Sequence, residues 1–228
     1  MLIGLLPSWR VAGYFFVTKG PQRAGSVGGD VPTFEMFLRH LQEHEGEPVV
    51  RLASRWDPSS KLAFSRYLKN LYERRITSGL SCKVRKGDSN QSIGNTVARL
   101  VGNLLTDSNG FKRISSAAQG YPDCALAFQN RIMSGIALEL KATSNWVDAD
   151  SNRRVLLSST NRLRSLGLDV IRHAVVTAVY GLDQRRAIVR VNRLRIDLIE
   201  PDSQVTTRLE CAVSHKLLSR GTHTTYDI

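Results

Sequence analysis

The sequence has few cysteines, and none of them are spaced as metal ligands. Cys82, Cys124 and Cys211 are far apart, and no C-x-x-C motif occurs in the 228 residues. Structural zinc sites and disulfide frameworks both need grouped or evenly paired cysteines. We therefore expect neither, and we expect Cys124, which lies in an apolar segment, to be a small buried side chain. This cysteine usage favours a reducing cytoplasm.

Long apolar runs are also absent. No segment approaches the ~18 consecutive apolar residues that a helix needs to cross a bilayer. The apolar start of the chain lacks a basic region and is interrupted by Pro7 and Arg10, so we do not expect a secretory signal peptide. No continuous basic amphipathic helix is visible, which argues against a membrane surface as a partner.

Acidic residues are scarce relative to basic ones. The chain has 32 Lys and Arg against 20 Asp and Glu, a formal net charge of +12 and a pI near 10.1. This excess favours a polyanionic partner, and nucleic acid is the first candidate. The alternative is a basic protein with no polyanionic partner. Aromatic residues make up only 7% of the chain, so a stacking platform for single strands has weak support.

Residues 121–143 combine two apolar strands with charged ends. The first predicted strand opens with Pro122–Asp123, and the second ends with Glu139–Leu140–Lys141. Alternation along a strand places the acid and the lysine of the second strand on one side and the leucine on the other. Buried charge is costly unless it is paired or binds a metal. A divalent cation site with an adjacent lysine explains the pattern. The alternative is an edge hairpin with surface charges, because short motifs also arise by chance.

The remaining segments predict a mixed α/β protein. We expect one domain over residues 1–228, with a helical N-terminal portion (1–90) and a core (91–200). A strand that returns after a helical crossover is expected to lie parallel to its neighbour in a mixed sheet. The expected helices are 33–45, 59–76, 91–105 and 153–165, the last capped by Asp150 or Ser151. The expected strands are 111–117, the two central strands, 171–180 and 187–191, the last with a possible continuation to 199. Residues 20–32 and 79–90 are expected loops.

These features resemble the PD-(D/E)XK nucleases. Pro122–Asp123, fifteen intervening residues and Glu139–Leu140–Lys141 are similar to the motif of that superfamily. The order helix, three strands, helix, strand is similar to its common core, over about residues 91–180. The resemblance implies a central mixed sheet flanked by helices, with Asp123 and Glu139 as Mg²⁺ ligands and the backbone carbonyl of Leu140 as a further ligand. It also implies that Lys141 assists the attacking water.

One part of the family pattern is missing. Members often have an additional acid on the helix before the strands, and helix 91–105 has none. Asn95 is the only polar candidate near its start, and Glu73 on the earlier helix is an alternative acid. This departure puts a second metal site in doubt.

Among PD-(D/E)XK proteins, the chain length favours a type II restriction endonuclease that cuts double-stranded DNA as a homodimer in a bacterial or archaeal cytoplasm. No G-x-x-x-x-G-K-[ST] loop is present, so a helicase–nuclease fusion is excluded on this chain. We expect dimer contacts on apolar surface outside the core, in the N-terminal helices around Phe34 to Tyr72; the alternative is that the apolar stripes of these helices pack on the sheet. The alternatives are a structure-specific repair or recombination nuclease and a non-catalytic nucleic-acid-binding protein. The residue types that read bases or contact phosphates are concentrated at Asn152, Arg153, Arg154, Ser158, Ser159, Asn161 and Arg162, and at Lys83, Arg85 and Lys86.

Histidine catalysis has no support. The five histidines show no spacing of a metal site or catalytic triad, and we expect His173, inside a predicted strand, to be a core residue. The polar residues proposed above for DNA contact could equally form a solvated helix face and loop.

Overall fold

The structure, a computed structural model, describes residues 32–107, 110–114, 120–145, 154–209, 213–217 and 224–227. Residues 154–156, 206–209 and the last two ranges are described by their backbone alone. All of these residues belong to one compact unit, Val31–Ile228. In this described part, no helix is both long enough and apolar enough to cross a membrane.

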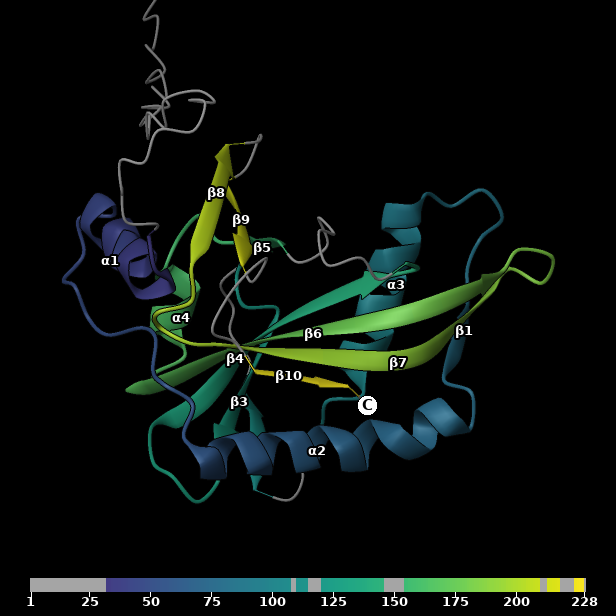
Figure 1. The fold of residues 1–228 in the computed structure, drawn as a ribbon, viewed down its shortest axis with the longest axis horizontal. Coiled ribbons are helices and arrows are strands. Elements are labelled where there is room, and N and C mark those ends of the chain that lie inside the picture. The colour runs from purple at the N-terminus through teal and green to yellow at the C-terminus, as the bar shows by residue number, and fades with distance from the viewer. Residues whose placement is uncertain are drawn as a thin grey trace, which may run out of the picture. The chain divides into compact units, whose positions relative to one another are not determined.

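A mixed seven-stranded sheet forms the centre of this unit (Figure 1). Six strands follow the order β1-β7-β6-β4-β3-β2, and β10 also pairs with β7. Strands β4 and β6 run parallel, and the other described pairs of this sheet are antiparallel. The strands are β1 (Ser81–Lys83), β2 (Phe111–Ile114), β3 (Cys124–Phe128), β4 (Ser134–Thr143), β6 (Val170–Asp183), β7 (Ile188–Ile199) and β10 (Thr224–Asp227). A second sheet has the order β5-β9-β8, from β5 (Arg154–Leu156), β9 (Val213–Leu217) and β8 (Val205–Leu209).

Two pairs of helices cover opposite faces of the main sheet. Helices α2 (Pro58–Thr77) and α3 (Asn90–Asn103) pack against Leu138, Val176 and Ile196, which share one face. Helices α1 (Phe34–His44) and α4 (Asn161–Ser165) pack against Ala137, Val175 and Ile199 on the other face. Figure 1 shows α2 running along one side of the sheet. The coarse prediction, a mixed α/β sheet flanked by helices, is confirmed.

The first three helices begin where the sequence supplies an N-cap. The side-chain oxygens of Thr33, Asp57 and Ser89 accept hydrogen bonds from the backbone N–H groups of Met36, Ser60 and Ser92. Such caps satisfy donors that a helix start leaves without a partner. The predicted positions of these three helices are confirmed to within a few residues.

Two predicted segments differ from the structure. The expected helix 153–165 is wrong in its first part, because Arg154–Leu156 form strand β5 and the helix covers only Asn161–Ser165. Thr160, just before this helix, is fully buried, and its backbone N–H donates to Glu45 at 2.7 Å, a tertiary contact that the local sequence does not reveal. The expected caps Asp150 and Ser151 lie outside the described residues. The expected loop 79–90 contains β1, which pairs with β7.

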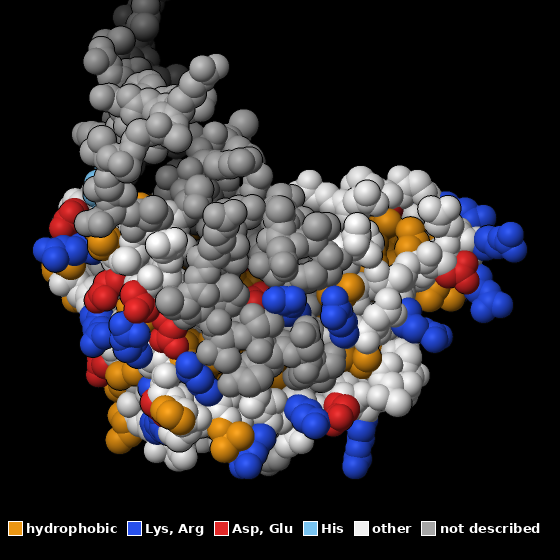
Figure 2. All heavy atoms as spheres, in the orientation of Figure 1, with side chains coloured by type: hydrophobic (Ala, Val, Ile, Leu, Met, Phe, Trp, Pro, Cys, Tyr) orange, Lys and Arg blue, Asp and Glu red, His pale blue; other side chains and the backbone are white. Residues whose placement is uncertain are grey.

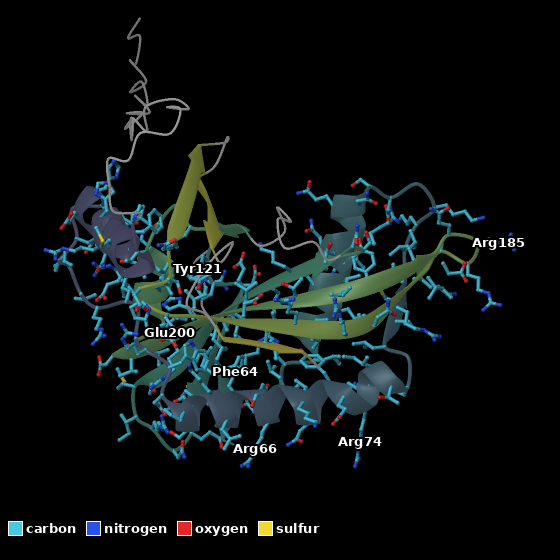
Figure 3. All side chains as sticks on the ribbon, viewed as in Figure 1. Phe64, Arg66, Arg74, Tyr121, Arg185 and Glu200 are labelled. Atoms are coloured by element: carbon cyan, nitrogen blue, oxygen red, sulfur yellow. The ribbon has the colours of Figure 1, made fainter. Side chains whose placement is uncertain are left out.

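The apolar stripes of α1 and α2 face inward. Phe34, Phe37 and Leu38 of α1 are buried, as are Phe64 and Tyr72 of α2. Phe64 points from α2 toward the sheet (Figure 3). These side chains form the core, whereas Met36 of α1 and Leu62 of α2 are exposed. The dimer contact in this part of the chain stays a prediction.

Candidate functional site

The candidate site lies where β4 continues past the start of β3. The two strands pair from Ala127↔Gly135 to Cys124↔Leu138. The antiparallel register therefore places Asp123 opposite Glu139, one step beyond the last recorded pair. Beyond that step β4 runs on to Thr143 without β3 beside it.

A cleft opens beside this part of β4. Its volume is about 320 Å³, and Asp123, Leu140 and Lys141 line it together with residues of α3. The Asp123 side chain is exposed, whereas Glu139 is only 4% exposed. The site therefore joins one accessible carboxylate to one buried carboxylate.

Hydrogen bonds fix the two carboxylates against each other's backbone. The Leu140 N–H donates to Asp123 Oδ2 at 2.7 Å. The Glu139 carboxylate accepts a hydrogen bond from the backbone N–H of Asp123. The N–H and C=O of one strand residue point to the same edge, so the Leu140 carbonyl faces the side where Asp123 lies. Two carboxylates and one carbonyl oxygen thus converge at one strand edge.

Lys141 neutralises part of the buried charge. Its Nζ lies 2.6 Å from Glu139 Oε1, and both side chains lie on the face opposite Leu140, as alternation predicts. Burial raises the pKa of Glu139 to about 7; the charge of Asp123 also raises it, and Lys141 opposes the shift. A buried carboxylate in this position would be stabilised by an additional cation.

The donor set fits a magnesium ion better than a zinc ion. Among the described residues, no group of three His, Cys, Asp or Glu side chains is placed to hold a metal. Two carboxylates and a backbone carbonyl are hard oxygen donors, and Mg²⁺ commonly retains several waters beside such a partial set. Asp123, Glu139 and the Leu140 carbonyl are therefore the residues that would hold it.

Helix α3 supplies no third acid to the cleft. Asn95 and Arg99 are its polar lining residues nearest the helix start. Glu73, the alternative acid, lies on the exposed surface of α2 in an ion pair with Lys69 at 3.7 Å, and it does not line the cleft. The structure therefore does not bring Glu73 to the site.

Two contacts that the sequence did not reveal anchor the backbone around Asp123. Arg162 on α4 donates from Nη1 to the Gly120 carbonyl at 2.8 Å and from Nη2 to the Asp123 carbonyl at 3.2 Å. The hydroxyl oxygen of Tyr121 lies 2.7 Å from His173 Nδ1. Arg162, predicted to contact DNA, thus holds the segment that bears Asp123.

His173 is a core residue, as predicted. It is 1% exposed, and its Nε2 lies 2.7 Å from the Leu52 carbonyl. A carbonyl oxygen can only accept, so Nε2 carries the proton and Nδ1 accepts from the Tyr121 hydroxyl. Burial lowers the pKa of His173 to about 4, so the imidazole is neutral at pH 7.

The other predicted DNA-contacting residues are dispersed. Lys83 pairs in register with Ile188 near the β6–β7 turn, and Arg185 lies at the end of this hairpin (Figure 3). Lys and Arg side chains occur both at this end and along the α2 surface (Figure 2). Asn152 and Arg153 lie outside the described residues, as does the side chain of Arg154. The remaining predicted DNA-contacting residues are exposed or half-buried, and none of them lines the cleft. They are Ser158, Ser159, Asn161, Lys83, Arg85 and Lys86.

No family model, curated protein or solved structure matches this chain. Function must therefore be argued from the chemistry of Asp123, Glu139 and Lys141. These residue types, converging on one strand edge beside a cleft, are suited to metal-assisted hydrolysis.

Proposed function

We propose that the protein is a Mg²⁺-dependent nuclease that hydrolyses phosphodiester bonds in double-stranded DNA. The observation that carries this proposal is the convergence of Asp123, Glu139 and Lys141 at the edge of β4, beside an open cleft. The net charge of +12 supports a polyanionic substrate. Apart from β5, which belongs to the second sheet, the order α3, β2, β3, β4, α4, β6, with β4 parallel to β6, is the one that the PD-(D/E)XK resemblance implies.

Each residue has a separate chemical role in this proposal. When bound, Mg²⁺ supplies polarisation of a phosphoryl oxygen and a lowered pKa for a bound water. Asp123 and Glu139 provide the negative charge that positions the cation. Lys141 donates a hydrogen bond to the attacking water or to the charge that develops on the phosphate. Glu139 keeps the Lys141 ammonium beside this region, since the two groups are 2.6 Å apart.

The narrower proposal is a type II restriction endonuclease. In this proposal each chain contributes one set of catalytic residues, whereas a double-strand break needs two cuts. A homodimer with two-fold symmetry on a palindromic site supplies both cuts from one gene. Sedimentation at micromolar protein, with and without cleavable duplex, tests this. A monomer under both conditions that nicks one strand at a time would favour a repair or nicking enzyme.

The decisive experiment is incubation with phage DNA, with and without Mg²⁺, followed by sequencing of the ends. We expect discrete fragments with a common terminal sequence only when Mg²⁺ is present. Cleavage confined to branched or damaged DNA would support the structure-specific alternative. Retarded DNA without any cleavage would support a non-catalytic binding protein. From the resemblance, Ca²⁺ is expected to support binding with little cleavage.

A further inference from the structure

A polar stripe runs along the exposed side of α3. Gln91, Asn95, Arg99 and Asn103 follow one another at four-residue spacing, and all four are exposed. Residues at this spacing share one side of a helix. In the described part of the chain, the structure assigns none of these four side chains a hydrogen bond or ion pair. Their amide and guanidinium donors are therefore available to a ligand.

Glycines hold this stripe close to the catalytic strand. A Cβ on Gly102 would lie 2.6 Å from Leu140 Cδ1, and one on Gly94 would lie 3.6 Å from the Ala142 carbonyl oxygen. Because the first distance is so short, a side chain at position 102 would fit only if Leu140 moved. The backbone of α3 therefore packs directly on β4, beside the Asp123 and Lys141 side chains.

The hollow beside α3 extends beyond the candidate site. The cleft that contains Asp123 and Lys141 shares Asn95 and Arg99 with a second hollow of about 440 Å³. The second hollow continues to Gln91 near the start of the helix. At 1.5 Å per residue, the stripe is ~18 Å long. Measured along the duplex axis, where one strand rises about 3.4 Å per nucleotide, this length covers several consecutive phosphates.

We propose that this groove along α3 binds the phosphodiester backbone of the DNA strand that is cut, with Arg99 and Asn95 contacting phosphate oxygens next to the scissile bond. The inference rests on the proposed nuclease function and adds the path of the substrate strand. Helix α3 contains no acidic residue, so nothing on it repels a phosphate. Arginine and asparagine are common phosphate-contacting side chains, and contacts to charged oxygens are the stronger hydrogen bonds.

Helix α2 offers a competing surface with the same residue types. Arg66, Asn70 and Arg74 are exposed and also follow one another at four-residue spacing. Arg66 and Arg74 point away from the sheet, on the side of α2 opposite Phe64 (Figure 3). None of these three residues lines the catalytic cleft. The pair Asn70 and Arg74 therefore matches Asn95 and Arg99 in chemistry, spacing and exposure but not in position.

The test compares two double variants, Asn95→Ala/Arg99→Ala and Asn70→Ala/Arg74→Ala. Binding of a cleavable duplex is measured in Ca²⁺ over a series of salt concentrations, and cleavage is measured in Mg²⁺. We expect the α3 variant to bind about tenfold or more weakly, because contacts to charged groups are lost. Its slope of log K against log salt should fall by about 0.9 for each lost phosphate contact. Arg99→Lys in place of Arg99→Ala should restore most of the salt slope, and the α2 variant should behave as the wild type.

The possible failures are distinguishable. All substituted side chains are exposed, and unchanged thermal unfolding verifies that each variant folds. If the α2 variant loses binding while the α3 variant retains it, the inference is wrong and the nuclease proposal stands. Unchanged binding and cleavage in the α3 variant would also overturn the inference. A wild-type protein that neither binds nor cuts duplex DNA would refute the proposed function and the inference with it.

Discussion

The two faces of the main sheet differ in chemistry although the same strands build both. On β4, Leu138 is fully buried against the cluster that includes α2 and α3, whereas its neighbour Glu139 lies on the opposite face. On β6, Val176 joins the same apolar cluster, whereas Thr177 is a buried polar residue on the opposite face. Successive strand residues point to opposite faces, so one backbone serves both environments.

The two faces of the main sheet are therefore expected to contribute differently, one mainly to stability and the other also to the chemistry of the candidate site. The α2–α3 face buries apolar side chains and so contributes mainly through the hydrophobic effect. The opposite face also buries an apolar cluster under α1 and α4, and in addition it carries buried groups that can titrate, among them Glu139 and His173. Buried polar groups usually cost stability unless they are fully paired. We therefore expect substitutions on the two faces to affect different measurements.

The largest expected effect is on catalysis. Under the proposed function, Asp123→Ala should reduce Mg²⁺-dependent cleavage by about 10³-fold or more, because the carboxylate that would hold the metal is removed. Glu139→Ala should act similarly. Single-turnover cleavage with saturating protein measures the chemical step. Leu138→Ala, next to Glu139 on the other face, is the matched control and should cleave close to the wild-type rate while it remains folded. Normal cleavage by folded Asp123→Ala would mean that the site is misassigned.

The apolar face should dominate the free energy of unfolding. Leu138→Ala removes a side chain that is 0% exposed and should cost about 2–5 kcal/mol. Glu139→Gln keeps the size but removes the ionic partner of Lys141, whose side chain is 21% exposed, so it should lower stability by less than Leu138→Ala does. Urea unfolding in the absence of divalent cations measures both. A larger loss of unfolding free energy in Glu139→Gln than in Leu138→Ala would contradict the expectation that the α2–α3 face contributes more to stability.

His173 should make stability depend on pH. Its pKa is lowered by burial to about 4 in the folded protein, against an ordinary value of 6.5. The folded state therefore binds a proton less readily than the unfolded chain. The contribution of the neutral His173 to the free energy of unfolding is fully present above pH 6.5 and is lost as the pH falls through 4. The whole loss amounts to roughly 3 kcal/mol. Urea unfolding between pH 7 and pH 4 measures it.

The control for this pH effect is a pair of glutamine variants. His173→Gln should lower stability at pH 7 but flatten its fall toward pH 4. His40→Gln, on the exposed side of α1, should leave the fall unchanged. An equal fall in wild type and His173→Gln would show that another group is responsible.

The order of elements could be predicted from the sequence because its signals are local. Apolar spacing and N-caps mark α1, α2 and α3, and continuous apolar runs mark β3, β4 and β6. The parallel pairing of β4 and β6 follows from the intervening helix. Strands β1 and β5 are not predictable from the local sequence, because strands of only three residues depend on pairing with distant residues.

The candidate site was only partly predictable for a similar reason. Asp123, Glu139 and Lys141 were found from spacing, and the structure brings them together. The density of base-reading residue types around Arg162 predicts a DNA contact, which stays a prediction. The sequence does not reveal that the Arg162 guanidinium donates to the Gly120 and Asp123 carbonyls. No sequence motif indicates that Arg99 lies at the candidate site. Its position in the cleft depends on how closely Gly102 lets α3 approach β4.

The smallest predicted effect concerns Thr177, which lies in register between Lys141 and Arg195 on the face that bears the site. Its hydroxyl is buried, and no hydrogen-bond partner for it occurs among the described residues. Replacement of such a group by an apolar group of the same shape removes a desolvation cost. Thr177→Val should therefore raise the free energy of unfolding by about 1 kcal/mol.

The matched control is Val176→Thr, which introduces the same hydroxyl on the apolar face. That variant should lower the free energy of unfolding by about 1–3 kcal/mol, because the new hydroxyl lies among aliphatic side chains. Urea unfolding of both variants at one pH gives the comparison. We expect the change in unfolding free energy to have opposite signs at the two adjacent positions, because their side chains lie in different environments. A loss of stability in Thr177→Val would instead show that its hydroxyl is hydrogen-bonded in solution, for example to a bound water, and that polar groups on this face are fully paired.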